Sequence, residues 1–546
     1  MPIDNNLAVS VLGLYLLALA VLGWIGYRRG ANDEEDYFLA GRTQNWWVTS
    51  ISIMATFFSA FALLGAPGMV YREGVAFALF SLNLPIAGLA IYALGSRIWR
   101  IGKTFGYITP ADLICGYYGG QKTLRILVTL TAFLWVIPYI MMQFQAGGLV
   151  WSRLFPGMYA FEQGTILLAA ITAIYVLVGG MRSIAWSDVL QGLLLMGGML
   201  LGGIAILTLT GGPANFGRKL MELPASSLTL PGNSGTWHWS KMMTVVLFAA
   251  LAGILQPAQW MRLYSSRNRE ALRKSALCFA ICLPPCFLLG TMLVGLGGQV
   301  LYPLEWTESG HFQASTAVGS YDEIFVVILR DVLPSVLGSF GILLGAITLV
   351  AIMAASMSTA DSSLHALSAV TVRDIYKSIF RPESGERESI NVGRFVIVLA
   401  SGLAVFLVLR GKHLERVGDT SEILQMLVAL GLVAVAFTSQ LLPVTVDILF
   451  IRRGTPLGAI VGLILGLAGA FAFGPLLGSL ATASEAWDRW NLIQSLLRNI
   501  EILKTAIPID ASAWGLLFNT LGFTGISYFS RPVPEETRKA FSDLVN

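Results

Sequence analysis

The chain has 546 residues, of which 55% are hydrophobic and only 12% are charged, and its mean hydropathy is +0.69. A soluble domain carries about 25% charged residues, so this composition excludes a soluble globular enzyme, a disordered protein and a nucleic-acid-binding protein. The formal net charge of +4 is small, and its distribution along the chain is more informative than its total.

Apolar runs that are long enough to cross a bilayer recur along the whole chain. A membrane helix needs about 20 such residues, and thirteen windows meet that length. We expect spans at approximately 7–27, 45–67, 74–99, 124–152, 162–180, 186–210, 240–262, 274–301, 336–370, 391–410, 423–450, 457–476 and 510–530. Residues 490–504 are amphipathic and are expected at the outer surface rather than across the membrane.

Lysines and arginines are distributed unevenly over the connections. If the N-terminus is outside, the inner connections, with Arg262 counted among them, hold about twice as many as the outer ones. Basic residues favour the cytoplasmic side, so we expect an outer N-terminus and a cytoplasmic C-terminus in a plasma membrane of the bacterial inner-membrane type. No connection is long enough for a nucleotide-binding domain, which leaves a secondary transporter, a channel or an intramembrane enzyme.

The second span contains small and hydroxyl residues from Thr49 to Ser59. Such a span could unwind and offer backbone carbonyls to a cation, or its hydroxyls could bond between packed helices. No Pro or Gly lies between Asn45 and Leu64, so the sequence alone shows no break.

Glutamines lie in two other spans. One of these spans contains Pro138 and Gln143. The other reads Gln256 to Trp260, and its Pro257 permits a kink and frees a carbonyl. These amides could bind a solute or satisfy helix ends. The candidate solute-binding residues are Phe57, Ser59, Gln143, Gln256, Gln259 and Trp260.

The ninth span carries the densest polar cluster, between Ser356 and His365. The hydroxyls of the adjacent Ser358 and Thr359 diverge by about 100° around a helix axis. They could flank a small hard cation, which takes oxygen ligands, or bond between helices. Asp361 and His365 share one face at i, i+4, where they could form a proton relay, an inner gate or a water-accessible pair that holds the helix end.

Four segments carry a resemblance to the sodium:solute symporter family. They are Asp36–Arg42, Tyr175–Ser183, Trp186–Asp188 with Gln191, and Met357–Ser362 with Asp374–Tyr376. The resemblance implies an all-α polytopic membrane protein of the LeuT type. Residues 45–210 and 240–450 would form two inverted five-helix repeats, and residues 1–44 and 457–546 would be accessory.

The resemblance also implies a family-type sodium site. Its ligands would be the carbonyls of Ala55, Phe58 and Ala355 and the hydroxyls of Ser358 and Thr359. Asp188 matches a family carboxylate implicated in cation coupling near the inner side. As an alternative, which does not exclude the first, Asp188 would be the N-cap of the sixth span.

The substrate indications are weaker. Phe57 stands where proline-type members have Asp, which argues against proline. Gly65–Gly68 with Tyr71 resembles the pantothenate-type members, and Pro138–Tyr139 with Gln143 resembles the monocarboxylate branch. No Arg or Lys is evident at mid-membrane, so a half-helix N-terminus would have to bind a carboxylate.

The expected function is therefore sodium-coupled symport of a small organic solute, such as pantothenate or a monocarboxylate, by alternating access. The alternatives are a proton-coupled symporter that uses Asp361 and His365, and a transporter-like solute sensor. The expected partners are the solute, the sodium ion and the bilayer. We expect no enzymatic activity, no cofactor besides sodium as the coupling ion, no nucleic acid and no obligate protein partner.

Overall fold

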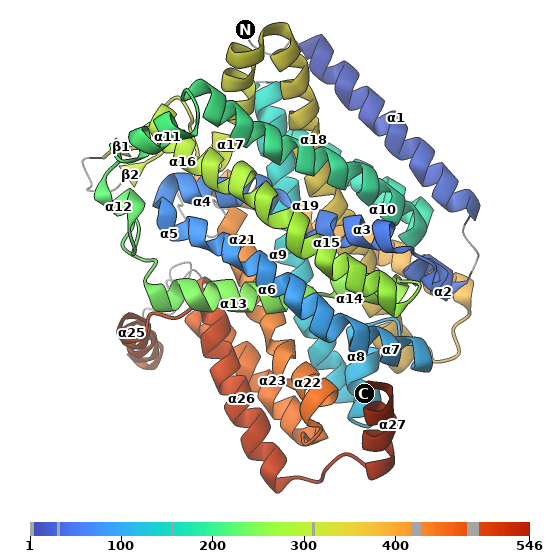
Figure 1. Cartoon of the computed structure of the whole chain (residues 1–546). Helices are drawn as coiled ribbons and strands as arrows, with labels where there is room; N and C mark the ends of the chain where they lie inside the picture. The colour runs from blue at the N-terminus through green and yellow to red at the C-terminus, as the bar shows by residue number, and fades with distance from the viewer. Residues whose placement is uncertain are drawn as a thin grey trace.

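Helices dominate the part of the chain that the structure, a computed structural model, describes: residues 5–29, 33–155, 157–307, 312–416, 427–477 and 491–545 (Figure 1). The helices of the first half are α1 (Asn5–Arg29), α2 (Glu34–Leu39), α3 (Trp46–Phe57), α4 (Ala66–Glu73), α5 (Val75–Ala78), α6 (Asn83–Ala90), α7 (Ser96–Phe105), α8 (Pro110–Tyr117), α9 (Lys122–Leu154), α10 (Ala160–Leu209), α11 (Pro213–Leu220), α12 (Ala225–Leu228), α13 (Trp239–Leu255) and α14 (Pro257–Ser265). The helices of the second half are α15 (Arg269–Phe287), α16 (Val294–Leu301), α17 (Ile324–Val327), α18 (Leu333–Val370), α19 (Glu386–Arg416), α21 (Leu427–Thr438), α22 (Leu442–Val446), α23 (Pro456–Phe473), α25 (Asn491–Ala506), α26 (Ala511–Phe529) and α27 (Glu535–Val545).

Short 3-10 and π-helical turns extend several of these helices. They are η1 (Ala40–Arg42), η2 (Phe61–Gly65), η3 (Leu79–Leu82), η4 (Ile91–Gly95), η5 (Leu288–Leu293), η6 (Tyr321–Glu323), η7 (Ile328–Val332), η8 (Thr371–Phe380), η9 (Ser439–Leu441) and η10 (Asp447–Ile451). Two short strands, β1 (Glu305–Trp306) and β2 (Phe312–Gln313), pair antiparallel with Glu305 opposite Gln313.

Twelve of the thirteen expected spans fall on helices or bent pairs that are long and apolar enough to cross a membrane, whereas α26, at the span expected at 510–530, is not among them. Within the described residues, nine helices are long and apolar enough to cross a membrane, or up to eleven if each of two bent pairs counts as one span. The two spans expected at 162–180 and 186–210 form the single bent helix α10. The span expected at 510–530 is the 19-residue helix α26. The first four residues of the span expected at 423–450 lie outside the described residues.

Two spans are broken in the middle. The segment before the first break, α3, meets Phe61–Glu73 at 57°, and α13 meets α14 at 53°. The second break follows from the sequence, since Gln256 is extended (ψ 144°) and Pro257 begins α14 at a position where its missing N–H is harmless. The first break has no such residue, so contacts with neighbouring helices must produce it.

A glycine in a left-handed conformation bends α10. Gly180 has φ 55° and ψ −163°, a combination that is essentially restricted to glycine. Asp188 lies eight residues beyond this bend, inside α10. The expectation that Asp188 is a helix N-cap is therefore wrong, because its carboxylate bonds to neighbouring helices instead, as described below.

The long helices α9, α10 and α18 pack on one another and form the centre of the bundle. The broken segment α3 packs against α10 and α18, and α14 packs against α18 and α3. Helices α23 and α26 form a tightly packed pair on another side (Figure 1). Large apolar side chains on the outer surface, such as Leu14, Phe395 and Phe529, are more than 60% exposed, as expected of helices that face lipid.

Candidate functional site

The break after Phe57 leaves several backbone carbonyls without their usual helical partners. In an uninterrupted helix, each carbonyl accepts from the N–H four residues later. Here the Ser59 N–H donates to the Phe57 carbonyl (3.1 Å) instead of the Ala55 carbonyl. The Ala62 N–H donates to the Ser59 carbonyl (2.9 Å) instead of the Phe58 carbonyl. The carbonyls of Ala55 and Phe58 are thus available for other partners.

Helix α18 presents hydroxyls to this break. The Ser358 hydroxyl lies 3.3 Å from the Ala55 carbonyl oxygen and 2.9 Å from the Ala355 carbonyl oxygen. The neighbouring Thr359 hydroxyl is fully buried and has no hydrogen-bond partner among the described residues. A buried polar group without a partner is unfavourable, and the Thr359 hydroxyl is such a group. Of the five expected sodium ligands, Ala55 is on α3, and Ala355, Ser358 and Thr359 are on α18. The fifth, Phe58, is the C-cap residue of α3.

The break is held from its other side by α9. The Gln143 side-chain oxygen accepts from the Ala60 N–H at 2.9 Å. The Tyr139 hydroxyl donates to the Ser59 hydroxyl at 3.1 Å, which in turn accepts from the Phe61 N–H at 3.1 Å. These bonds cap the N-terminus of the second half-helix. They replace helical bonds that α3 would otherwise continue, which explains a break without Pro or Gly.

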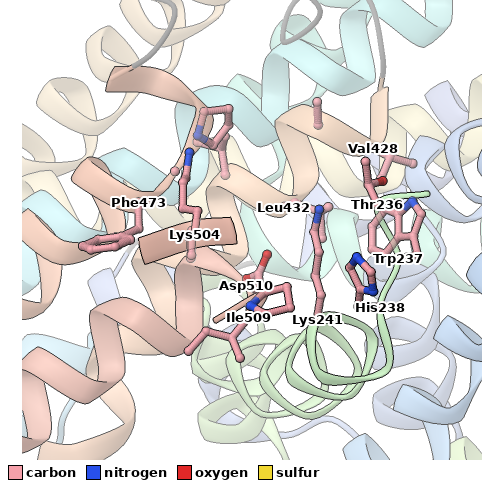
Figure 2. Close-up of a pocket in the computed structure, with 18 of the residues that line it drawn as sticks. Thr236, Trp237, His238, Lys241, Val428, Leu432, Phe473, Lys504, Ile509 and Asp510 are labelled. Atoms are coloured by element: carbon pink, nitrogen blue, oxygen red, sulfur yellow. The ribbon is translucent and has the colours of Figure 1, made fainter. Parts of the chain in front are cut away.

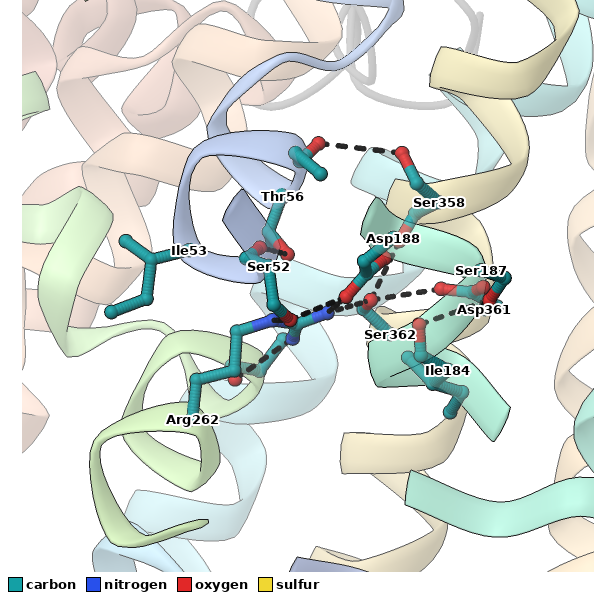
Figure 3. A network of polar contacts seen from close by, with 12 residues as sticks. Ser52, Ile53, Thr56, Ile184, Ser187, Asp188, Arg262, Ser358, Asp361 and Ser362 are labelled. Atoms are coloured by element: carbon teal, nitrogen blue, oxygen red, sulfur yellow. Dashed lines mark hydrogen bonds and ion pairs between the residues drawn. The ribbon is translucent and has the colours of Figure 1, made fainter. Parts of the chain in front are cut away.

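A buried ion pair lies on the N-terminal side of the break in α3. The Arg262 guanidinium (α14) donates from Nη2 to Asp188 Oδ2 (α10) at 2.7 Å, and the side chains are 1% and 0% exposed. Ser52 of α3 donates to the same carboxylate oxygen at 2.5 Å and accepts from Arg262 Nε at 2.8 Å. Arg262 also bonds to Ser362 of α18. Figure 3 shows these side chains converging from four helices.

Arg262 was not predicted as a site residue, because basic residues near the end of a span are expected in the cytoplasmic connection. The structure instead places it inside the bundle. The only sequence signal was its place in the segment that Pro257 begins. A helix that starts at Pro257 contains both Ala258 and Arg262, one turn apart, and so keeps Arg262 inside the bundle.

Asp361 and His365 point to different neighbours despite their helical spacing. Asp361 accepts from the Tyr175 hydroxyl and, at 2.8 Å, from the Ser362 hydroxyl. The His365 ring is buried against the rings of Tyr37 and Phe38, with centroids 5.3 and 5.6 Å away. The two side chains therefore belong to separate environments, one polar and one aromatic.

The solute candidates gather at the two breaks. Ser59 and Gln143 lie at the first break, as described above. Gln256 lies at the second break, and the amide of the nearby Gln259 donates to the Ile53 carbonyl at 3.0 Å. Trp260 is fully buried in α14. The half-buried Phe57 ring meets Phe279 edge-to-face at 4.8 Å. The broken segments α3 and α14 thus bond directly to one another.

A family model, curated relatives and a solved structure all relate this chain to solute transporters. The model of the sodium:solute symporter family matches residues 37–466. The osmoregulated proline transporter OpuE of Bacillus subtilis is 24% identical over 462 residues, which cover 84% of this chain and 86% of the relative. The sodium/pantothenate symporter of Haemophilus influenzae is 25% identical over 375 residues, or 68% of this chain and 72% of the relative. The solved outward-open structure of a Na+-coupled sialic acid symporter is similar with a TM-score of 0.71 at 19% identity, covering 97% of this chain and 98% of that one.

The apolar helices, the two broken spans and the structural similarity define an integral membrane protein of the LeuT fold class, as expected from the sequence. The chain belongs to the sodium:solute symporter family.

Proposed function

We propose that this protein carries a small organic solute across the membrane together with sodium by alternating access. The observation that carries the proposal is the oxygen-lined contact between α3 and α18. Ser358 lies within 3.3 Å of the Ala55 carbonyl, and Thr359 contributes a buried hydroxyl without a partner among the described residues. Hard cations take oxygen ligands, and broken helices supply backbone carbonyls to them.

In this proposal, sodium is bound by the carbonyls of Ala55, Phe58 and Ala355 and the hydroxyls of Ser358 and Thr359. The ion would join α3 to α18 at the point where α3 is broken. With a monocarboxylate as solute, one sodium ion and one anion carry no net charge, so the sodium concentration gradient alone would drive accumulation. Each further sodium ion moved per cycle would add one net positive charge, which gains about 2.3 kcal/mol per 100 mV of membrane potential, or roughly 50-fold accumulation.

The proposed solute is a small carboxylate such as pantothenate or a monocarboxylate. A pantothenate symporter is among the relatives, and Phe57 stands where proline-type members have Asp. The buried Arg262 already pairs with Asp188, so it has no free charge for the solute. At the first break, Gln143 and Ser59 already cap the half-helix. The N-terminus of α14 has no side-chain cap, and we assign the solute carboxylate to that end, beside Gln256 and Trp260.

We further propose that the N-terminus is outside, that the C-terminus is cytoplasmic, and that the two five-helix repeats are 45–210 and 240–450. In this orientation the Ser52–Asp188–Arg262 cluster lies inward of the sodium site. Because it joins α3 and α14 to α10 and α18, it would keep the inner side closed. Asp188 and Arg262 would have to separate before the solute leaves toward the cytoplasm.

The test is uptake into proteoliposomes that contain the full chain. The panel is labelled pantothenate, short monocarboxylates, proline, a hexose and urea, each with and without an inward sodium gradient. We expect sodium-stimulated accumulation of a carboxylate and little accumulation of proline. Accumulation driven by a pH step without sodium would instead support proton coupling through Asp361. Sodium-dependent thermal stability without uptake of any solute would support a sensor.

A further inference from the structure

A cavity of about 570 Å³ lies between the N-terminal end of α13, one face of α21 and the segment that runs from α25 into α26 (Figure 2). Met69 of α4 also lines it. Sites for small molecules in proteins are commonly about 300–1,000 Å³. In the proposed orientation this cavity is at the outer side of the broken segments. None of the residues assigned above to sodium or solute lines it.

One wall of the cavity is apolar and continuous. Val428, Leu432, Val433, Ala436 and Phe437 line it from α21, and Phe473 of α23 continues it. The α21 positions follow the pattern i, i+4, i+5, i+8 and i+9, which places them on one helix face. A ligand with an apolar body would remove this surface from water, which is favourable in proportion to the area buried.

The opposite rim is charged, and its acidic groups are already engaged. Glu73 pairs with Arg72 at 3.2 Å, and Glu501 pairs with Lys504 at 3.6 Å. Asp510 caps α26 by accepting from the Ser512 N–H at 2.9 Å. Glu73 and Glu501 thus have basic partners, whereas Asp510 has no salt bridge among the described residues, and the charges of Asp510 and Glu73 also act on Lys241.

Lys241 is the remaining cation. Figure 2 shows its side chain extending from α13 into the cavity. Among the described residues, no carboxylate lies within 4.0 Å of its ammonium group, which lies over the face of Trp237, 4.9 Å from the ring centroid. An ammonium group in a cavity with an apolar wall attracts an anion more strongly than it would in bulk water.

The position of Lys241 is fixed by the residues beside it. The Ser240 hydroxyl donates to the Pro508 carbonyl at 2.7 Å, and the Asp510 N–H donates to the Thr244 hydroxyl at 3.0 Å. Both bonds join the first two turns of α13 to the segment before α26. The cation is therefore held on one side of the cavity, and the apolar wall of α21 lies on another.

We propose that this cavity is a second binding site, for an organic monoanion with an apolar body. Lys241 pairs with the anionic group, and the apolar face of α21 covers the body of the ligand. The binding itself does not depend on sodium.

The cavity is one helix away from the first break. The side of α21 that faces away from the cavity packs closely on the broken segment, since a Cβ on Gly431 would lie 2.6 Å from the Phe61 ring.

The test is equilibrium dialysis of radiolabelled 4-phenylbutyrate against the full chain in lipid nanodiscs, in sodium-free choline buffer. The neutral amide of the same shape, 4-phenylbutyramide, is the chemical control, and empty nanodiscs measure partition into lipid. The variants are Lys241→Gln, the charge-preserving Lys241→Arg, and the matched control Lys219→Gln on the exposed surface of α11.

We expect saturable binding of the anion, at least tenfold weaker binding of the amide, and a tenfold loss in Lys241→Gln that Lys241→Arg largely restores. Lys219→Gln should bind as the unmodified protein does. Equal binding of anion and amide, unchanged binding in Lys241→Gln, or no binding above empty nanodiscs would each overturn the proposal. Because dialysis is done without sodium, failure of sodium-coupled uptake would leave this result unaffected, and the two proposals can fail separately.

Discussion

Arg262 and Asp188 form a salt bridge of 2.7 Å, 74 residues apart in the chain, with both side chains essentially inaccessible to solvent. Each is also bonded to Ser52. This arrangement joins the two broken segments, α3 and α14, to α10. A buried pair is weak evidence for net stabilisation, but removal of one partner leaves an uncompensated charge.

Neutralising one member of this pair should therefore destabilise the protein more than neutralising both. Removal of one partner of a buried ion pair costs about 3–5 kcal/mol. We expect Arg262→Gln and Asp188→Asn each to lower the thermal unfolding temperature of the detergent-solubilised protein. The double variant should recover most of the loss, because two amides of similar shape can bond to one another.

The control for these single and double variants is the exposed pair of Lys274 and Glu270, which lie one turn apart on α15 at 2.7 Å. Exposed pairs contribute about 0–1 kcal/mol, so Lys274→Gln should leave the unfolding temperature nearly unchanged. If the unfolding temperature of the double variant fell by the sum of the two single decreases, Asp188 and Arg262 would act independently.

The Thr359 hydroxyl should set the apparent affinity for sodium. Thr359→Val keeps the shape and removes the oxygen, so we expect about tenfold weaker sodium activation of uptake, equivalent to about 1.4 kcal/mol. Thr359→Ser should retain near-normal activation. Ser356→Ala is a matched control, since the Ser356 hydroxyl bonds within its own helix to the Ile352 carbonyl at 3.2 Å. Unchanged sodium dependence in Thr359→Val would remove this residue from the proposed site.

Gln143 should influence sodium as well as solute, because it caps the half-helix that begins at the break. Gln143→Leu leaves the buried Ala60 N–H without an acceptor, and such a loss costs about 1–3 kcal/mol. We expect weaker sodium activation together with a higher solute concentration for half-maximal uptake. Tyr139→Phe removes only the bond to Ser59 and should have a smaller effect.

Thr131→Val provides the comparison on the same helix, since the Thr131 hydroxyl bonds to the Leu127 carbonyl of α9 at 2.9 Å. Thr131→Val should leave unchanged both the sodium concentration and the solute concentration that give half-maximal uptake. If Gln143→Leu altered the dependence on solute alone, the capping bond would have no role in forming the sodium site.

The span positions could be predicted from the sequence because bilayer thickness fixes the length of an apolar run. The break between α13 and α14 could also be predicted, since Pro257 cannot continue the preceding helical bonds. The break after Phe57 could not, because it depends on bonds from Gln143 and Ser358, which come from distant parts of the chain. A local sequence pattern holds no information about such partners.

Arg262 shows a second limit of sequence reasoning. Basic residues near the end of a span usually lie in the cytoplasmic connection, and that rule placed Arg262 there. Its burial depends on a carboxylate brought next to it by the bend of α10 and on a serine from α3. The ligands implied by the family resemblance, by contrast, could be named residue by residue, and the structure places the Ser358 hydroxyl within hydrogen-bond distance of the Ala55 and Ala355 carbonyls. That these groups bind sodium stays a prediction.

The bend at Gly180 should be sensitive to the smallest possible substitution. Gly180→Ala would force an L-residue into φ 55°, ψ −163°, and its Cβ would lie 2.9 Å from the Tyr37 ring. Backbone strain of this kind costs about 1–3 kcal/mol. We expect a lower unfolding temperature, and reduced uptake because the part of α10 that carries Asp188 shifts relative to α3.

Gly197→Ala is the control on the same helix, since nothing lies within 4 Å of its Cβ. Alanine is favoured over glycine inside a helix by about 1 kcal/mol, so Gly197→Ala should be neutral or stabilising. Equal unfolding temperatures for the two variants would mean that the bend does not require glycine.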